Sequence, residues 1–227
     1  MRSWREGTEG FFEKHLPFYE VRDAMKTAQG CALCALEERG LRRYLEILLH
    51  ERVHDGRIRD SLLRSRGYCS RHAHDLVRLP DHLGIAIIYR AQVSMFQEFL
   101  ETPPHRGRYL RSWRKHEVCP ACGYILQKRQ RHAGVLAGWC EDGEMKYALE
   151  QAPPFCAEHT MAVLDRIEDA AAAAGFIGIQ RRKLAALMGE LDEFCAKQDI
   201  RRIGEPPGPE RDSWERAVGV MASYRWP

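Results

Sequence analysis

Apolar residues along most of the chain recur at steps of three and four positions, which is the period of an amphipathic helix. Long stripes of this kind cover about 35–53, 82–101 and 162–199. No segment alternates apolar and polar residues in the way that a half-buried strand requires. The pattern therefore predicts an all-α protein of about eight to ten helices. The stripe in the first segment consists of Leu36, Leu41, Tyr44, Leu45, Leu48 and Leu49.

Short motifs in this helical chain occur twice and in the same order. A Cys-x-x-Cys motif at 31–34 returns at 119–122, 88 residues later, and a Cys-x-x-His motif at 69–72 returns at 156–159, 87 residues later. An Asp-Gly pair lies between the two motifs in each copy, and we expect its glycine to end the preceding helix in the left-handed conformation. We interpret this order as an internal duplication, which predicts a tandem pair of pseudo-symmetric helical repeats.

Proline- and glycine-rich stretches divide the chain further. The stretch "TPPHRG" separates the two repeats, and "GEPPGP" precedes a short tail. The predicted organisation has four parts: 1–30 as an N-terminal segment with a leading helix, 31–104 and 105–203 as two metal-binding helical repeats, and 204–227 as a linker with a C-terminal helix.

The repeated motifs offer the ligands of two metal sites. Structural zinc is bound tetrahedrally by four thiolate and imidazole groups, and each motif presents two such groups from one turn or one helix face. We expect each repeat to be clamped by its own Cys3His site, so that the chain holds two zinc ions. The first site would use Cys31, Cys34, Cys69 and His72, and the second would use Cys119, Cys122, Cys156 and His159.

Other interpretations of these cysteines stay open. Histidine can replace cysteine at an iron–sulfur cluster, which makes such a cluster the main alternative to zinc. Thiol–disulfide exchange is less favoured, because the motifs lack the βαβ setting of a thioredoxin-like site. Cys140 and Cys195 stand outside the motifs and align with apolar positions of the first repeat. We interpret both as small core residues, with a redox role left open.

Charge and composition are those of an ordinary globular chain. The formal net charge is +3, and residues 31–117 are mildly basic, with 16 Arg and Lys against 11 Asp and Glu. No apolar run approaches the roughly 20 residues of a membrane span, and no signal peptide is visible at the N-terminus. We therefore expect a soluble, cytoplasmic protein without a membrane partner. In that reducing compartment, eight cysteines favour metal binding over a disulfide framework.

No catalytic arrangement of residues stands out. The sequence has no Ser-His-Asp pattern, glycine-rich phosphate loop, HExxH motif or pair of catalytic carboxylates. A catalytic zinc would need a vacant coordination position, which four protein ligands do not leave. We expect a non-enzymatic interaction or scaffold protein whose partner is another protein or a second copy of the chain. A nucleic-acid partner is a weaker alternative, based on the basic first half of the chain and on its basic and aromatic segment 105–116.

At these motifs the chain resembles a family of uncharacterised prokaryotic proteins, classed as a domain of unknown function, with CPLC-like and GFCxxH motifs in both halves. The resemblance covers about 16–200 and departs from the family pattern at Pro154, where glycine is usual. It implies paired metal-binding motifs on a helical scaffold and no established activity. The matching stretches are "CALC" (31–34), "GYCSRH" (67–72), "LGIAI" (83–87), "CPAC" (119–122) and "PFCAEH" (154–159).

Overall fold

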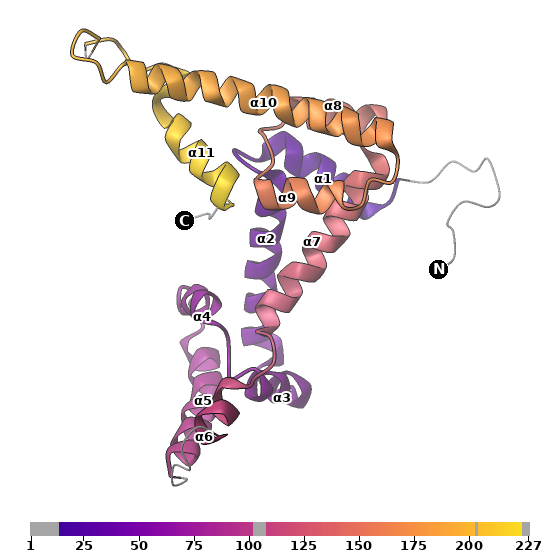
Figure 1. Cartoon of the computed structure of the whole chain (residues 1–227). Helices are drawn as coiled ribbons and strands as arrows, with labels where there is room; N and C mark the ends of the chain where they lie inside the picture. Colours follow the sequence, from indigo (N-terminus) through magenta and orange to yellow (C-terminus); the bar gives the residue numbers. More distant parts are fainter. Residues whose placement is uncertain (1–13, 102–107, 203, 224–227) are drawn as a thin grey trace, which may run out of the picture. The chain divides into compact units, whose positions relative to one another are not determined.

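A computed structural model describes residues 14–101, 108–202 and 204–223. All regular structure in these ranges is helical, and no strand occurs in them (Figure 1). The all-α prediction is therefore confirmed, with eleven α-helices in the described ranges, slightly more than expected. They are α1 (Leu16–Thr27), α2 (Ala32–Ile47), α3 (Gly56–Arg64), α4 (Ser70–Val77), α5 (His82–Glu101), α6 (Arg108–Arg114), α7 (Pro120–Trp139), α8 (Gly143–Gln151), α9 (Ala157–Leu164), α10 (Ala170–Ala196) and α11 (Ser213–Ala222).

Two short helical segments of other types complete the described elements. A π-helical turn, Leu48–Arg52, continues α2, and a 3₁₀ turn, Pro209–Asp212, leads into α11. The last long stripe, about 162–199, could have formed one helix or two, and the structure divides it between the end of α9 and α10. Within α10 the helix continues through Gly175 and Gly178.

The two Asp-Gly pairs begin helices rather than end them, so the sequence prediction for their glycines was wrong. Asp55 is the N-cap of α3, and its carboxylate accepts a hydrogen bond from the backbone N–H of Arg57. Asp142 caps α8 in the same way, by accepting from the N–H groups of Glu144 and Met145. An aspartate satisfies donors that a helix start leaves unpaired. Of the described glycines, only Gly67 has a positive φ, 82°.

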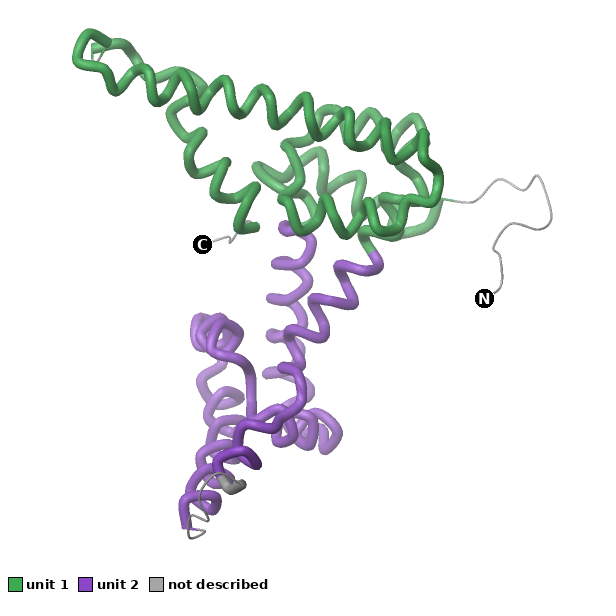
Figure 2. The backbone as a smooth tube through the Cα atoms, viewed as in Figure 1, with its two compact units in different colours: residues 1–33, 132–224 green, residues 34–131, 225–227 purple. Residues whose placement is uncertain are grey.

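The chain divides into two compact units, which Figure 2 shows in different colours. One unit contains residues 1–33 and 132–224, and the other contains 34–131 and 225–227. The division of the sequence into 1–30, 31–104, 105–203 and 204–227 was based on the order of the motifs. It stays a prediction.

The core of the unit 1–33 and 132–224 forms where α1 packs against α8. Phe18 of α1 is fully buried, and its ring meets the ring of Trp139 edge to face, with the centroids 5.2 Å apart. At the rim of the same contact, Lys14 and Arg22 pair with Glu144 of α8 at 2.8 and 2.9 Å. Farther along the chain, α11 packs on α10 and contacts α9.

The core of the unit 34–131 surrounds an antiparallel pair of helices, α2 and α7. Glu37 and Arg129 form a bidentate ion pair near one end, with N–O distances of 2.8 and 3.1 Å. Tyr44 and Tyr124 stack near the other end, with ring centroids 4.6 Å apart. Beyond this pair, α3 and α4 each pack against α5. The buried cluster contains Leu41, Leu45, Leu48, Leu49, Val53, Leu62, Tyr68, Leu76, Leu79 and Ile88, together with Cys119 and Ala121.

The order of helices in the first half of the sequence recurs in the second half. A long helix starts at each Cys-x-x-Cys motif, a short helix follows each Asp-Gly pair, another short helix starts at each Cys-x-x-His motif, and a long helix closes the series. The members of the two series are α2–α5 and α7–α10. This order agrees with the sequence pattern, while duplication stays an interpretation of it.

Candidate metal centres

The eight cysteine and histidine side chains singled out in the sequence gather into two groups of four. In each group, the four candidate ligand atoms lie within 4.8 Å of one another. The composition of each group is three cysteines and one histidine, as predicted. The first centre contains Cys31, Cys34, Cys156 and His159, and the second centre contains Cys69, His72, Cys119 and Cys122.

The pairing of motifs is exchanged relative to the sequence prediction. Each centre combines the Cys-x-x-Cys motif of one half of the chain with the Cys-x-x-His motif of the other half. The expectation that each repeat is clamped by its own site was therefore wrong. Residue type and spacing identified the candidate ligands, but their grouping depends on the path of the chain between the motifs.

Helix length explains the exchange. The first Cys-x-x-Cys motif stands at the start of α2, which together with its π-helical continuation runs for 21 residues, or about 30 Å. The second motif opens α7, which has 20 residues and a similar length. The short helices that follow, α3 and α8, have nine residues each, or about 13 Å, too short to bring the chain back. The next Cys-x-x-His motif therefore reaches the start of the other long helix.

The first centre is fully buried. Its four residues expose between 0 and 5% of their surface. The Nδ1 atom of His159 lies 3.4 Å from the sulfur of Cys31 and 3.1 Å from that of Cys156. Cys156 is also the N-cap of α9, where its sulfur accepts a hydrogen bond from the backbone N–H of His159. The same turn therefore starts the helix and places two candidate ligands.

The second centre also places a cysteine at a helix N-cap, without the capping hydrogen bond to its sulfur, and its residues are more exposed. Cys69 is the N-cap of α4, and the Nδ1 atom of His72 lies 3.3 Å from its sulfur. Nδ1 also lies 3.6 Å from the sulfur of Cys119 and 3.4 Å from that of Cys122. His72 and Cys119 are buried, whereas Cys122 is half-buried and Cys69 is exposed.

These separations fit a tetrahedral ion. Bonds of about 2.3 Å to sulfur and 2.0 Å to nitrogen imply edges of about 3.8 Å between two sulfurs and 3.5 Å between sulfur and nitrogen. The sulfurs of Cys69 and Cys122 are 3.7 Å apart, and the nitrogen–sulfur separations span 3.1 to 3.6 Å across both centres. A disulfide requires about 2.05 Å between its sulfurs, and none of the eight cysteines forms one. The residues present therefore fit a four-coordinate metal.

The pKa values of two thiols in the second centre shift in opposite directions. Burial, followed by the negative charge of Cys119, raises the pKa of Cys122 to about 12. Burial also acts to raise the pKa of Cys69, but hydrogen bonds from the His72 backbone and from Cys122 outweigh it and leave that pKa below its ordinary value. Three adjacent thiolates need a compensating cation, which a divalent metal supplies as it displaces their protons.

Several residues around the centres had no signal in the sequence. The hydroxyl oxygen of Ser223, just after α11, lies 3.4 Å from the sulfur of Cys156 and 3.3 Å from a carboxylate oxygen of Glu158, and it can donate its single hydrogen to either. Ser223 has a φ of 68°, which is unusual for a residue with a side chain. The backbone N–H of Phe155 donates a hydrogen bond to the side-chain oxygen of Gln180 at 3.0 Å. This bond holds the segment just before Cys156 against α10. These contacts connect the first centre to α10 and to the end of α11, and the spacing of the motifs gave no indication of them.

The two remaining cysteines have different environments. Cys140 is 4% exposed and packs as a core residue, as predicted. Cys195 is exposed on α10, so its assignment to the core was wrong. Neither belongs to a group of three or more potential ligands in the described part of the chain.

The basic segment proposed for nucleic acid is only partly described, since 105–107 lie outside the described residues. Within the described part, the ring of Trp113 packs against Phe96 and Phe99, with centroids 4.8 and 4.6 Å away. The guanidinium of Arg66 covers the same ring at 3.8 Å. Trp113 is thus engaged within the protein, which favours a structural role over base stacking.

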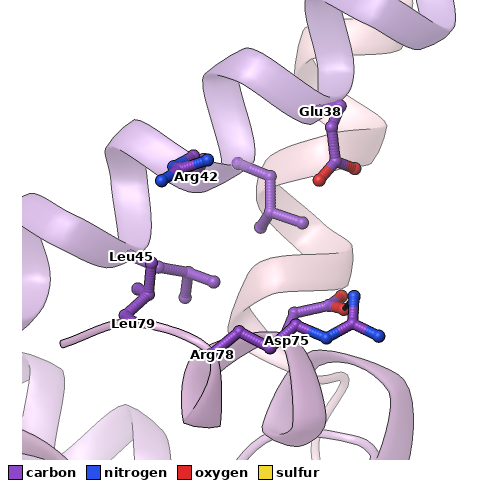
Figure 3. A pocket seen from close by; sticks show the side chains of 7 residues that line it. Glu38, Arg42, Leu45, Asp75, Arg78 and Leu79 are labelled. Atoms are coloured by element: carbon purple, nitrogen blue, oxygen red, sulfur yellow. Dashed lines mark ion pairs between the residues drawn. The ribbon is translucent and has the colours of Figure 1, made fainter. Parts of the chain in front are cut away.

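A pocket with a cavity volume of about 150 Å³ lies between α2 and α4 (Figure 3). Its floor is apolar, and two acidic and two basic side chains stand around it. Arg78 faces Asp75 at 3.8 Å, and Arg42 is engaged by Glu46 at 3.0 Å. Burial, followed by the charge of Asp75, raises the pKa of Glu38. The lining residues are Glu38, Leu41, Arg42, Leu45, Asp75, Arg78 and Leu79.

Comparisons with known proteins place the chain without assigning it an activity. The model of a family of unknown function, DUF6062, matches residues 13–225. The chain is similar to an uncharacterised 23.9 kDa protein in the xynA 3′ region of Caldicellulosiruptor sp. (strain Rt8B.4), with 24% identity over 200 residues, 85% of this chain and 94% of the relative. No solved structure matches. No helix in the described ranges is long and apolar enough to cross a membrane.

Proposed function

Because the chain belongs to DUF6062, a family of unknown function, its role has to be argued from its own residues, and we propose a zinc-binding scaffold protein without enzymatic activity. In this proposal each chain holds two zinc ions, one in each Cys3His centre. One observation carries the proposal: four motifs far apart in the sequence meet as two complete sets of four ligands with tetrahedral separations.

Zinc is the metal that this ligand set favours. Three thiolates and one imidazole in a closed tetrahedron are a usual set for structural zinc, which has no redox chemistry of its own. Four protein ligands fill the coordination sphere and leave no position for a reacting water. The metals would therefore act on the fold, by tying α2 to α9 and α4 to α7 through their starting turns.

The functional partner in this proposal is another protein. A chain whose metal centres are saturated by its own ligands acts through its surface rather than through chemistry at the metal. We place it in the cytoplasm, where reduced thiols are available to bind zinc. The mild net charge of +3 argues against the strongly basic surface that nucleic-acid binding favours.

Elemental analysis of anaerobically purified protein, with a visible absorption spectrum, tests the metal. We expect two zinc ions per chain and no colour. Serine replacements at Cys34 and at Cys122 should each remove about one equivalent. The Cys195→Ser variant is the control, because this exposed cysteine lies outside both centres, and it should retain both ions. Iron with sulfide and absorption near 400 nm would contradict the proposal and establish an iron–sulfur protein.

A further inference from the structure

The two centres differ in how exposed their residues are to solvent. In the first centre all four residues are buried, and three of them, Cys31, Cys156 and His159, expose none of their surface. In the second centre Cys69 is exposed and Cys122 is half-buried. The same four ligand types are thus presented once in the interior and once at the surface.

The two accessible sulfurs of the second centre are also neighbours. Cys69 and Cys122 lie 53 positions apart in the sequence, at the starts of α4 and α7, and their sulfurs are 3.7 Å apart. A disulfide bond needs about 2.05 Å, so a movement of under 2 Å joins them. The other two ligands, His72 and Cys119, are 3 and 8% exposed and lie behind this pair. An incoming oxidant therefore meets Cys69 first and finds Cys122 next to it.

We propose that Cys69 and Cys122 form a hydroperoxide-sensitive thiol pair whose oxidation releases the metal of the second centre and leaves the first centre loaded. The inference rests on the proposed metal content and adds a modification site to it. The first centre would be the permanent structural one, because none of its residues is more than 5% exposed.

The chemistry balances in two steps with a hydroperoxide as the oxidant. The Cys69 thiolate attacks one peroxide oxygen, the O–O bond breaks, and the products are a sulfenic acid and a hydroxide or alkoxide ion. The Cys122 thiolate then attacks the Cys69 sulfur, the S–S bond forms, and a second hydroxide ion leaves. Two electrons pass from the thiol pair to the peroxide. The metal loses two of its four ligands and is released.

The test uses full-length protein in which Cys140 and Cys195 are replaced by alanine, so that every remaining cysteine belongs to a centre. After metal content is measured, one to two equivalents of hydrogen peroxide are added, and released zinc is followed with a chromogenic chelator. We expect one equivalent to leave at least tenfold faster than the other. Peptide mapping by mass spectrometry should then find a Cys69–Cys122 disulfide, and a thiol reductant with added zinc should restore the second equivalent.

Matched variants separate this inference from the proposed metal content. Cys69→Ser should slow peroxide-driven disulfide formation in the second centre, whereas Cys31→Ser should leave the Cys69–Cys122 disulfide unchanged. Release of both equivalents at one rate, or a disulfide between Cys31 and Cys34, would overturn the inference while the metal content stands. A protein isolated without metal would instead refute the proposed function before any peroxide is added.

Discussion

At the scale of single residues, the Glu38 carboxylate is in a place where its negative charge is unfavourable. Glu38 projects into the pocket between α2 and α4, where burial opposes its ionisation and the negative charge of Asp75 adds to that effect (Figure 3). The arginines around this pocket compensate only in part, because Arg42 pairs with Glu46 and Arg78 is largely exposed. Such a carboxylate destabilises the folded state once it is ionised.

The Glu38→Gln variant should therefore be more stable than the native protein at neutral pH. The folded-state pKa of Glu38 is raised, so the folded protein binds this proton more tightly and loses stability as the pH rises through that pKa. The glutamine removes the penalty, which we expect to be under about 1 kcal/mol because the side chain is only partly buried. Urea denaturation between pH 5 and pH 8 should show a gain that shrinks toward low pH.

Glu46→Gln provides the comparison for that experiment. Glu46 lies on the same helix, but it makes an exposed ion pair with Arg42 at 3.0 Å. Its replacement should leave stability unchanged or slightly lower it at every pH in the range. A loss of stability in Glu38→Gln at pH 8 would contradict the assignment of a charge penalty to the pocket.

At the scale of secondary structure, α2 and α7 are held together by a polar contact as well as by packing. The Glu37 carboxylate receives two hydrogen bonds from Arg129, and both side chains are more than four-fifths buried. Gly40 lies under the ring of Tyr124, where an added Cβ would stand 3.3 Å from the hydroxyl oxygen. The small residue and the ion pair together set how closely the two helices approach.

Replacing Arg129 by methionine should destabilise the protein by about 3–5 kcal/mol. The substitution keeps an aliphatic chain but removes the guanidinium from a buried carboxylate, and such one-sided losses are among the most costly. Arg42→Met is the matched control, since its partner Glu46 is exposed, and it should cost no more than about 0.5 kcal/mol. Chemical denaturation monitored by circular dichroism measures the free energy of unfolding of both variants. Equal losses would contradict a larger contribution of the buried ion pair to stability.

Much of this level of structure was predictable from the sequence. The apolar stripe in 35–53 predicted α2, and the residue types and spacing of the motifs identified all eight residues of the two centres. The role of the Asp-Gly pairs was not predicted, because the same two residues suit a helix end and a helix start. Cys195 was misplaced because its position in the periodic pattern does not show which side of α10 is covered.

At the scale of the whole molecule, each candidate metal centre joins candidate ligands from both halves of the sequence. Motif spacing could not reveal this. With 34 residues between two motifs, the chain can either return to its own Cys-x-x-Cys motif or continue to the Cys-x-x-Cys motif of the other half. The deciding quantity was the length of α2 and α7 relative to the short helices after them. A comparison of those lengths with the spacing would have favoured the exchanged pairing.

Separate halves of the chain test the exchange directly. Residues 1–117 and 118–227, produced apart, should each bind zinc weakly, because each contains two ligands of each centre and no complete centre. Mixed in equal amounts, they should associate and take up two equivalents per pair. Zinc titration with size-exclusion chromatography would measure both results. Tight binding of one zinc by each isolated half would instead support pairing within repeats.

The exchange also sets an order of events while the ribosome is making the protein. The second centre is complete once position 122 has emerged, whereas Cys34 has to wait until His159 has been added, 125 residues later. At about 5–20 residues per second, this interval lasts roughly 6–25 seconds. The first thiols to leave the ribosome are thus the last to be enclosed. During synthesis, the centre that ends up most protected is the one left open longest to stray metal ions and oxidants.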